Sequence, residues 1–187
     1  MRLINKIKAV NALFNETDKD ISRFKKLSGL SCIAGCGDCC LKNDINATVL
    51  EFLPAAHNLF LQNKHEDILN KLQNNSNSIC AFYTPFNDKG FCSNYKNRGL
   101  ICRLFGFSVR ANKYGDKSLV TCKKIKSTFA NKTLDNTIAS APEITSYYMR
   151  LFGIDPGLSV QLFPINESIQ KALETVLIHY QYKKRRA

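Results

Sequence analysis

Eight cysteines are the residues of this sequence whose type and spacing could do chemistry. A first group is local and lies in a stretch punctuated by glycines; it comprises Cys32, Cys36, Cys39 and Cys40. A second group is widely spaced and could be gathered only by the fold; it comprises Cys80, Cys92, Cys102 and Cys122. Two or three residues between cysteines let a tight loop turn two sulfurs toward one metal ion. The pattern therefore predicts a metal centre held by thiolates.

The adjacent pair Cys39 and Cys40 is a different case, because neighbouring side chains diverge on a helix or a strand. We expect no easy local chelate from this pair, although a polynuclear centre or two neighbouring ions could use both. Eight thiols are enough for two sulfur-only tetrahedral sites or for one iron–sulfur cluster with spare cysteines. Thiolates suit zinc and iron alike, so the spacing does not select between them. Buried structural cysteines and a disulfide scaffold are the alternatives.

The composition of the chain is that of an ordinary globular protein. It has 187 residues, of which 44% are hydrophobic and 22% charged, so global disorder is excluded and a real core can form. The N-terminus interleaves Lys with Leu, Ile and Val and has no features of a signal peptide. We therefore expect a cytoplasmic protein without a membrane span, in which thiols stay reduced.

The chain is basic, with 27 Lys and Arg against 15 Asp and Glu. Two thirds of the excess lies in residues 76–127, and a second basic run ends the chain at residues 183–186. A basic surface suggests nucleic acid or an acidic partner. The competing interpretation is that these cations compensate the negative charge of metal-bound thiolates. No aromatic–basic stacking pattern favours nucleic acid.

Helical periodicity dominates both ends of the chain. It predicts a helix over 2–14, a break at 15–20, a short second helix that ends at Gly29, and then a glycine-punctuated loop over 30–40. Asn46 is expected to cap a helix that runs to Leu61. The remaining expected helices cover 65–72, 142–151 and the stretch after Asn166, with a polar loop over 74–78.

Two hairpins are expected in the middle of the chain. The first pairs 78–83 with 90–95, and the second pairs 104–110 with 118–122. The predicted architecture is mainly α with short β-hairpins around an irregular cysteine-rich metal-binding centre. We expect a single domain over 1–187, with a cysteine-cluster core at 30–125 and helical flanks at 1–29 and 140–187.

The cysteine pattern resembles the YkgJ-type cysteine-cluster family, described as a zinc- or iron-chelating domain. The resemblance runs from the local cysteine group through a helix containing Glu51 to the segments Cys80-Ala-Phe82 and Cys92-Ser-Asn-Tyr95. It ends in the segment from Tyr95 to Phe105, where Gly99 stands in place of the family's proline. The resemblance covers roughly residues 30–125 and implies binding of a metal or an iron–sulfur cluster, without supplying a reaction.

Two arginines lie within the last motif. Beside Cys102, the guanidinium of Arg98 or Arg103 could donate hydrogen bonds to ligand sulfurs and tune the centre; an ordinary ion pair is the alternative. Glu51 is expected to be a solvated helix residue. The histidines lack ligand spacing and are expected to be surface or core residues; they are His57, His65 and His179.

The sequence thus predicts a cytosolic protein that chelates iron, as an iron–sulfur cluster, or zinc. One alternative is a zinc-stabilised nucleic-acid-binding module. A second is part of a redox or methylase-like enzyme, since the first cysteine spacing coincides with that of radical S-adenosylmethionine enzymes and the cluster is similar to that of flagellin lysine methylases. The chain is too short for the barrel of the former or the additional parts of the latter.

Overall fold

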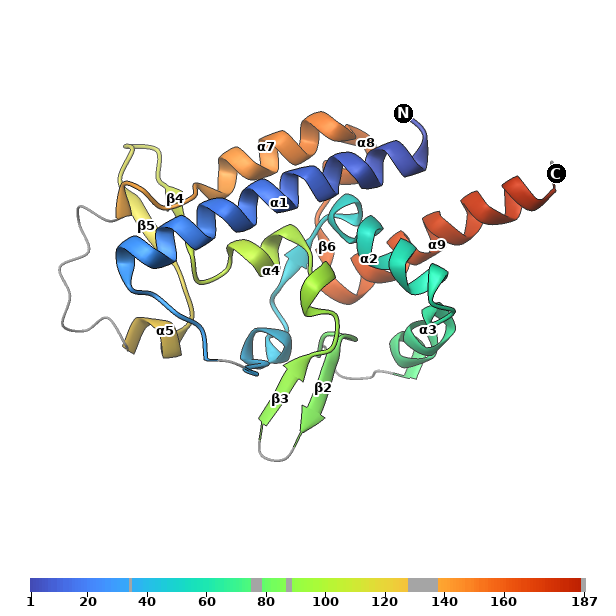
Figure 1. Ribbon diagram of the computed structural model, residues 1–187, viewed down its shortest axis with the longest axis horizontal. Helices are drawn as coiled ribbons and strands as arrows, with labels where there is room; N and C mark the ends of the chain where they lie inside the picture. Colours follow the sequence, from blue (N-terminus) through green and yellow to red (C-terminus); the bar gives the residue numbers. More distant parts are fainter. Residues whose placement is uncertain (34, 75–78, 87–88, 128–137, 186–187) are drawn as a thin grey trace.

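The computed structural model describes the chain except residues 34, 75–78, 87–88, 128–137 and 186–187. The described α-helices are α1 (Leu3–Ser28), α2 (Val49–Leu61), α3 (His65–Asn74), α4 (Leu100–Leu104), α5 (Lys123–Ser127), α7 (Ile144–Ile154), α8 (Pro156–Ser159) and α9 (Ile165–Lys184). Two short 3₁₀-helices, η1 and η2, cover Asp38–Leu41 and Tyr95–Asn97. The prediction of a mainly α protein with short hairpins is confirmed (Figure 1).

In the part of the chain that the structure describes, the strands form three two-stranded antiparallel sheets. Two hairpins are present, as predicted; they pair β2 (Tyr83–Phe86) with β3 (Lys89–Cys92) and β4 (Ser108–Ala111) with β5 (Lys117–Val120). The first strand lies later than predicted, because β2 begins at Tyr83, where the predicted strand over 78–83 ends. The third sheet, β1 (Asn46–Ala47) with β6 (Phe163–Pro164), was not predicted, because it joins segments far apart in the sequence. The turn of the first hairpin at 87–88 and most of the expected polar loop at 74–78 lie outside the described residues.

The N-terminal helix is continuous, so the predicted break at residues 15–20 is wrong. Thr17 is fully buried, and its hydroxyl donates a hydrogen bond to the carbonyl of Leu13 across 2.7 Å. The hydroxyl therefore has a hydrogen-bond partner within the helix. The two aspartates of the segment make tertiary contacts instead of capping, Asp18 with Arg103 and Asp20 with Tyr147. The polar residues therefore mark a helix face that other elements contact. The helix ends, as predicted, at Gly29 with φ 67°.

The N-cap of helix α2 is Thr48, whereas the sequence analysis predicted Asn46. The Thr48 hydroxyl accepts from the amide of Glu51, and the Glu51 carboxylate accepts from the Thr48 amide across 2.7 Å. This reciprocal capping box satisfies two otherwise unpaired amides. Asn46 instead lies in β1, opposite Pro164.

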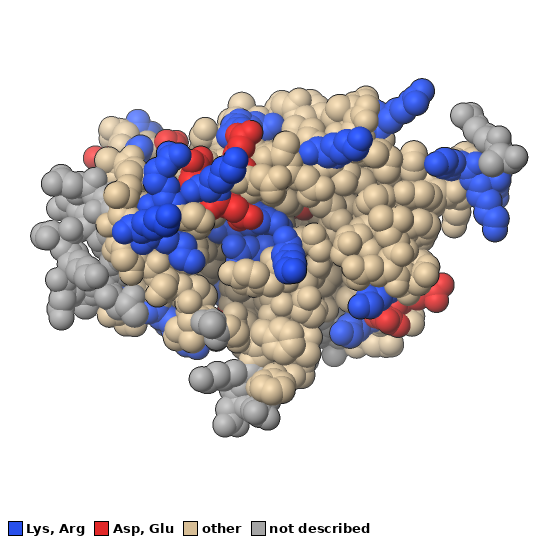
Figure 2. Space-filling model, viewed as in Figure 1, with Lys and Arg blue, Asp and Glu red and all other residues tan. Residues whose placement is uncertain are grey.

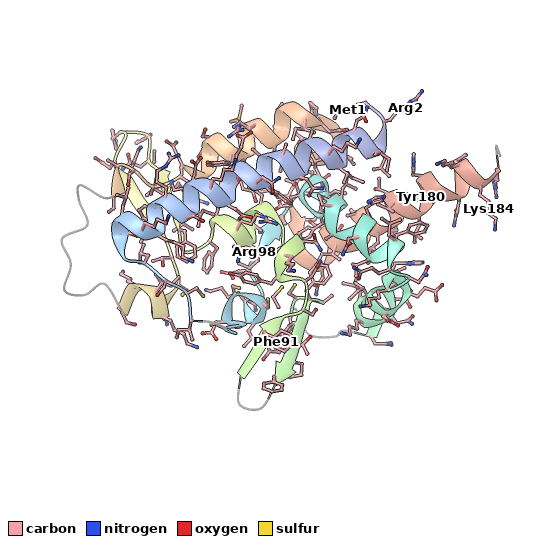
Figure 3. The ribbon with its side chains drawn as sticks, viewed as in Figure 1. Met1, Arg2, Phe91, Arg98, Tyr180 and Lys184 are labelled. Carbon is pink, nitrogen blue, oxygen red and sulfur yellow. The ribbon has the colours of Figure 1, made fainter. Side chains whose placement is uncertain are left out.

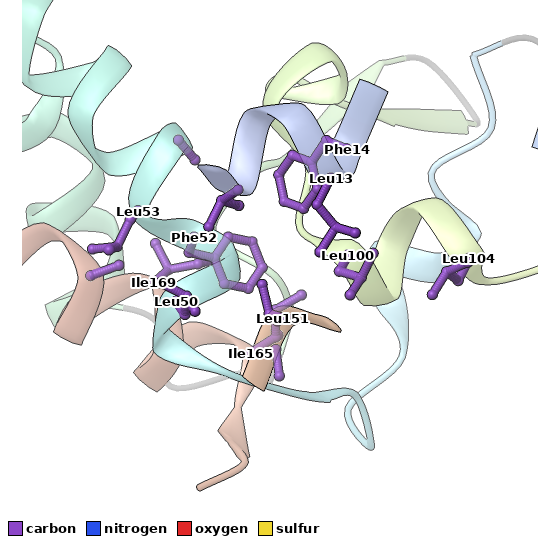
Figure 4. Packing of buried hydrophobic residues seen from close by; sticks show 14 of the residues in the cluster. Leu13, Phe14, Leu50, Phe52, Leu53, Leu100, Leu104, Leu151, Ile165 and Ile169 are labelled. Atoms are coloured by element: carbon purple, nitrogen blue, oxygen red, sulfur yellow. The ribbon is translucent and has the colours of Figure 1, made fainter. Parts of the chain in front are cut away.

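The hydrophobic core forms where α2 packs along α9 and α1 packs against α2, α4 and α7. Its largest fully buried side chains include Phe24, Phe52, Leu53, Leu100, Leu151 and Ile169. Figure 4 shows Phe14 beside Leu100, and Phe52 close to Leu50 and Ile169. This core fixes α2 and α4, and α4 carries one of the predicted ligands. None of the helices in the described ranges has the length and apolar character that crossing a membrane requires.

Candidate metal centre

A small enclosed pocket of about 40 Å³ gathers cysteines from both predicted groups. The cysteines on its walls are Cys36, Cys39, Cys40, Cys80, Cys92 and Cys102. They come from the loop before η1, from η1 itself, from the residues before β2, from β3 and from α4. The fold therefore brings widely separated cysteines around one pocket.

A larger and more open cavity of about 480 Å³ adjoins this pocket. Cys32 and Cys122 line the open cavity alone, whereas Cys36, Cys39 and Cys102 line both spaces. Each of the eight predicted cysteines thus lies on one of two neighbouring cavities that share part of their walls.

Backbone hydrogen bonds join the two cysteine groups. The amide of Cys80 donates to the carbonyl of Cys40 across 2.9 Å, and the amide of Cys40 donates to the carbonyl of Gly37 across 2.8 Å. Immediately downstream, the amide of Tyr83 donates to the carbonyl of Cys80, also across 2.8 Å, and leads the chain into β2. The local group is thereby attached to the hairpin that carries Cys92.

The thiols also contact one another. The side chain of Cys40 hydrogen-bonds to those of Cys39, Cys80 and Cys92. The bond from Cys40 lowers the pKa of Cys39 to about 6 and also lowers the pKa of Cys92, while the pKa of Cys40 itself is raised. Cys39 and Cys40 hydrogen-bond to each other although they are neighbours on η1, whereas the sequence led us to expect that they diverge. Burial raises the pKa of Cys102.

Arg98 lies where the sequence analysis expected it, on the walls of both cavities. Its guanidinium lies over the ring of Tyr95, 4.2 Å from the centroid, and its charge contributes to lowering the pKa of Cys39 and Cys92. Its Nε is buried and has no hydrogen-bond partner among the residues that the structure describes. Figure 3 places Arg98 between α1 and the hairpin that carries Phe91. A buried donor without an acceptor at this position suits an anionic centre.

Arg103, the second arginine predicted to contact the centre, is not on the walls of either cavity. Its Nε donates to the carbonyl of Arg98 across 3.1 Å, and its Nη2 to the carbonyl of Lys96 across 2.7 Å. Its Nη1 pairs with Asp18, and its guanidinium lies 4.4 Å from the centroid of the Phe14 ring. Arg103 therefore holds the backbone that carries Arg98.

Glu51 is fully buried, so the expectation of a solvated helix residue is wrong. Besides its capping bonds, its Oε2 accepts from the amide of Ile101 across 2.8 Å, and its Oε1 accepts from the hydroxyl of Tyr148 across 3.2 Å. Burial raises the pKa of this carboxyl, which the donors around it oppose. Glu51 thereby fixes the start of α4, one residue before Cys102.

Gly99, at the position of the family's proline, has a φ of −63°, which proline also adopts. The backbone therefore keeps the shape that a proline would impose. A Cβ here would lie 2.9 Å from Glu51 Oε2 and equally close to the Phe52 ring. In this chain the glycine allows α2 to approach the start of α4.

The histidines lie away from the cysteine cavities, as the sequence analysis expected. His57 and His179 pack against Tyr180, and His65 packs against Phe60. Within the described ranges, no group of three or more His, Cys, Asp and Glu side chains is arranged so that it could hold a metal ion as it stands. To bind a metal ion, the cysteine side chains would therefore have to move closer together.

Sequence reasoning missed most of the other residues that line the two cavities. The apolar walls of the enclosed pocket include Ile45, Phe52, Phe82, Phe105 and Ile165. Two of these aromatics follow cysteines closely in sequence, which was the available signal; the others come from distant elements. The open cavity adds charged residues, namely Asp38, Lys42, Lys123 and Lys124.

The donor set and its surroundings fit a thiolate-bound metal. Cysteine thiolates are soft ligands that suit zinc and iron–sulfur clusters. A scan against known protein families matches residues 31–125 to the CxxCxxCC family, whose description is "Putative zinc- or iron-chelating domain".

The chain belongs to this family. The match covers just over half of the sequence and includes all eight cysteines, and it confirms the resemblance to YkgJ-type cysteine-cluster proteins. A search of curated proteins and a search of solved structures each found no match. The family description supports chelation of zinc or iron.

Proposed function

We propose that this CxxCxxCC protein chelates iron, as an iron–sulfur cluster, or zinc through its cysteine thiolates. The observation that carries the proposal is the convergence of six cysteines, from separate segments of the chain, on one enclosed pocket. Cysteines placed only for packing would not need to meet, and thiols are the ligands that both metals accept.

The number of thiols favours more than one metal atom. A single tetrahedral ion takes four thiolates, which would leave two thiols of the enclosed pocket beside it without a role. A polynuclear centre, such as an iron–sulfur cluster or a pair of zinc ions, uses the adjacent thiols of Cys39 and Cys40 together. Bound iron–sulfur would supply one-electron redox chemistry, whereas bound zinc would stabilise the fold.

The surrounding residues would prepare the pocket for such a centre. Arg98 offers its buried Nε to a ligand sulfur and stabilises thiolates electrostatically. Arg103 does not reach the pocket itself, but its Nε donates to the carbonyl of Arg98 and so would help to keep Arg98 in position. Phe82 and Phe105 exclude water from the sulfurs. Reduced thiols would be maintained in the cytoplasm, which is the compartment that we propose.

The cations of the basic segment support charge compensation more than binding of nucleic acid. Lys123 and Lys124 line the cavity that the cysteines share, as does Arg98. Figure 2 shows many Lys and Arg side chains on one part of the visible face, with Asp and Glu among them. Positive groups on the walls of a thiolate cavity would offset the negative charge that metal-bound sulfur carries.

Oxygen-free purification of the full chain, followed by elemental analysis and a visible spectrum, tests the proposal. Brown protein with iron and sulfide supports a cluster, and colourless protein with zinc supports tetrahedral sites. Cys40→Ser should lower the metal content, while the control Ser22→Ala, on the exposed face of α1, should keep it. Metal-free wild-type protein that takes up neither metal on reconstitution would refute the proposal, as would full metal retention in Cys40→Ser.

A further inference from the structure

We infer that the eight cysteines form two neighbouring metal positions of different character. The inner position lies in the enclosed pocket and is closed by protein ligands. The outer position faces the open cavity, where solvent and a chelator can reach it. This inference rests on the proposed metal chelation and says which cysteines would serve which of two metal positions.

The distribution of the cysteines over the two spaces carries the first step. Cys40, Cys80 and Cys92 line the enclosed pocket alone, whereas Cys32 and Cys122 line the open cavity alone. Cys32 and Cys122 therefore do not face a metal ion in the enclosed pocket. The cysteines that line the enclosed pocket alone likewise do not face an ion in the open cavity. The three cysteines common to both walls can complete either position or bridge the two.

Exposure separates the two positions further. Cys40 and Cys80 are 7% and 5% exposed, among apolar walls that include Phe52 and Phe82. Cys32 is exposed, and the cavity that it lines has about twelve times the volume of the enclosed pocket, about 480 against 40 Å³. An ion in the enclosed pocket would be shielded from solvent, whereas an ion beside Cys32 would be accessible to it.

The two spaces also differ in charge. The lining of the open cavity contains the cations Lys42, Lys123, Lys124 and Arg98 and the carboxylate of Asp38, which pairs with Lys124 across 2.6 Å. Among the described residues, the lining of the enclosed pocket contains one of these cations, Arg98. The cations of the open cavity would offset the charge of the thiolates at the outer position, so the outer position lies in the more polar of the two spaces.

Metal release from the zinc-loaded full chain tests the two positions. With excess chelator and a colour indicator, we expect a fast phase from the outer position and a slow phase from the inner one. Cys122→Ser and Cys32→Ser should remove the fast phase and keep the slow one, and the exposed position of Cys32 makes misfolding of its variant a minor concern. Cys80→Ser should reduce the slow phase.

The outcomes separate this inference from the function on which it rests. Stoichiometric zinc that leaves in one phase, with unchanged metal content in both Cys32→Ser and Cys122→Ser, overturns the two positions and leaves chelation intact. A chain that binds no zinc or iron overturns both.

Discussion

Gly37 lies so close to Gly90 that a Cβ at residue 37 would be 2.5 Å from the Gly90 carbonyl oxygen. The same Cβ would lie 2.9 Å from the Tyr83 ring. The backbone at Gly37 thus packs directly against the backbone at Gly90, so the segment that carries Cys36 and Cys39 lies against the β2–β3 hairpin. Glycine at 37 is therefore a condition for the two cysteine groups to meet.

Gly37→Ala should destabilise the protein by about 1–3 kcal/mol, because the backbone must shift to relieve the overlap. It should also lower the metal content, since the shift separates Cys39 from Cys92. The control is Gly153→Ala, near the end of α7, where a Cβ meets nothing within 4 Å. That change should be neutral or stabilise by up to about 1 kcal/mol. Thermal unfolding and elemental analysis of both variants measure the difference, and equal behaviour would contradict the role of Gly37.

The two arginines should give opposite results. Arg98→Gln should weaken metal binding about 10-fold or more, as removal of a residue that supports the ligands does, with little loss of stability. Arg103→Gln should cost about 2 kcal/mol, because it breaks bonds from a charged donor to Asp18 and to the backbone. When folded, Arg103→Gln should keep its metal stoichiometry. Denaturant unfolding and a competitive metal titration separate these effects; the reverse ranking would show that the roles are exchanged.

Glu51→Gln should destabilise the chain by about 1–3 kcal/mol. The Thr48 amide donates to Oε1 of Glu51 and the Ile101 amide to Oε2, so the NH₂ group of a glutamine would place a donor against one of these two donors. The control Glu66→Gln changes a carboxylate in the exposed first turn of α3 and should have a much smaller effect. Denaturant unfolding at neutral pH measures both. Equal stability of the two variants would mean that the buried carboxylate does not hold α4.

Acid should weaken the metal-free protein partly through His57. Burial lowers the pKa of this imidazole below its usual value of 6.5, and the charge of His179 adds to the effect. The unfolded chain therefore takes up a proton at a higher pH than the folded chain, so stability is complete above pH 6.5 and declines as the pH falls below it. His57→Gln should reduce the fall in melting temperature between pH 7.5 and 5.5.

Tyr180→Phe is the matched control for this effect. It removes the hydroxyl that lies 2.8 Å from His57 Nε2 but keeps the ring that buries the imidazole. Since burial is the main cause of the shift, the fall in melting temperature should persist in this variant. A His57→Gln protein with the full acid-induced fall would contradict the assignment.

Removal of the metal should loosen the cysteine region before the helical core. The amide of Cys80 should exchange hydrogen faster in the metal-free protein, because its bond to the Cys40 carbonyl loses the support of the bound centre. Amides of α2 and α9, which pack along each other, should change little. Hydrogen exchange with and without chelator measures this, and uniform acceleration along the chain would contradict it.

Much of the fold followed from periodicity in the sequence. The helical stripe after Asn166 and the two hairpin patterns predicted α9 and both hairpins, because burial of one face repeats at a fixed interval. Helix α4 has five residues and offers too few turns for a stripe. The break expected in α1 failed because Asp18 and Asp20 find partners in Arg103 and Tyr147, which a local pattern cannot show.

The sequence by itself determined which cysteines are candidate ligands and that Arg98 is a candidate neighbour, since the types and spacing of these residues are local properties. Only the tertiary structure decided how these residues are divided. Whether a thiol faces an enclosed or an open cavity, and whether Glu51 and Arg103 are solvated or buried, depends on which distant segments pack beside them. Burial and charge are properties of three-dimensional neighbours, so no spacing rule encodes them.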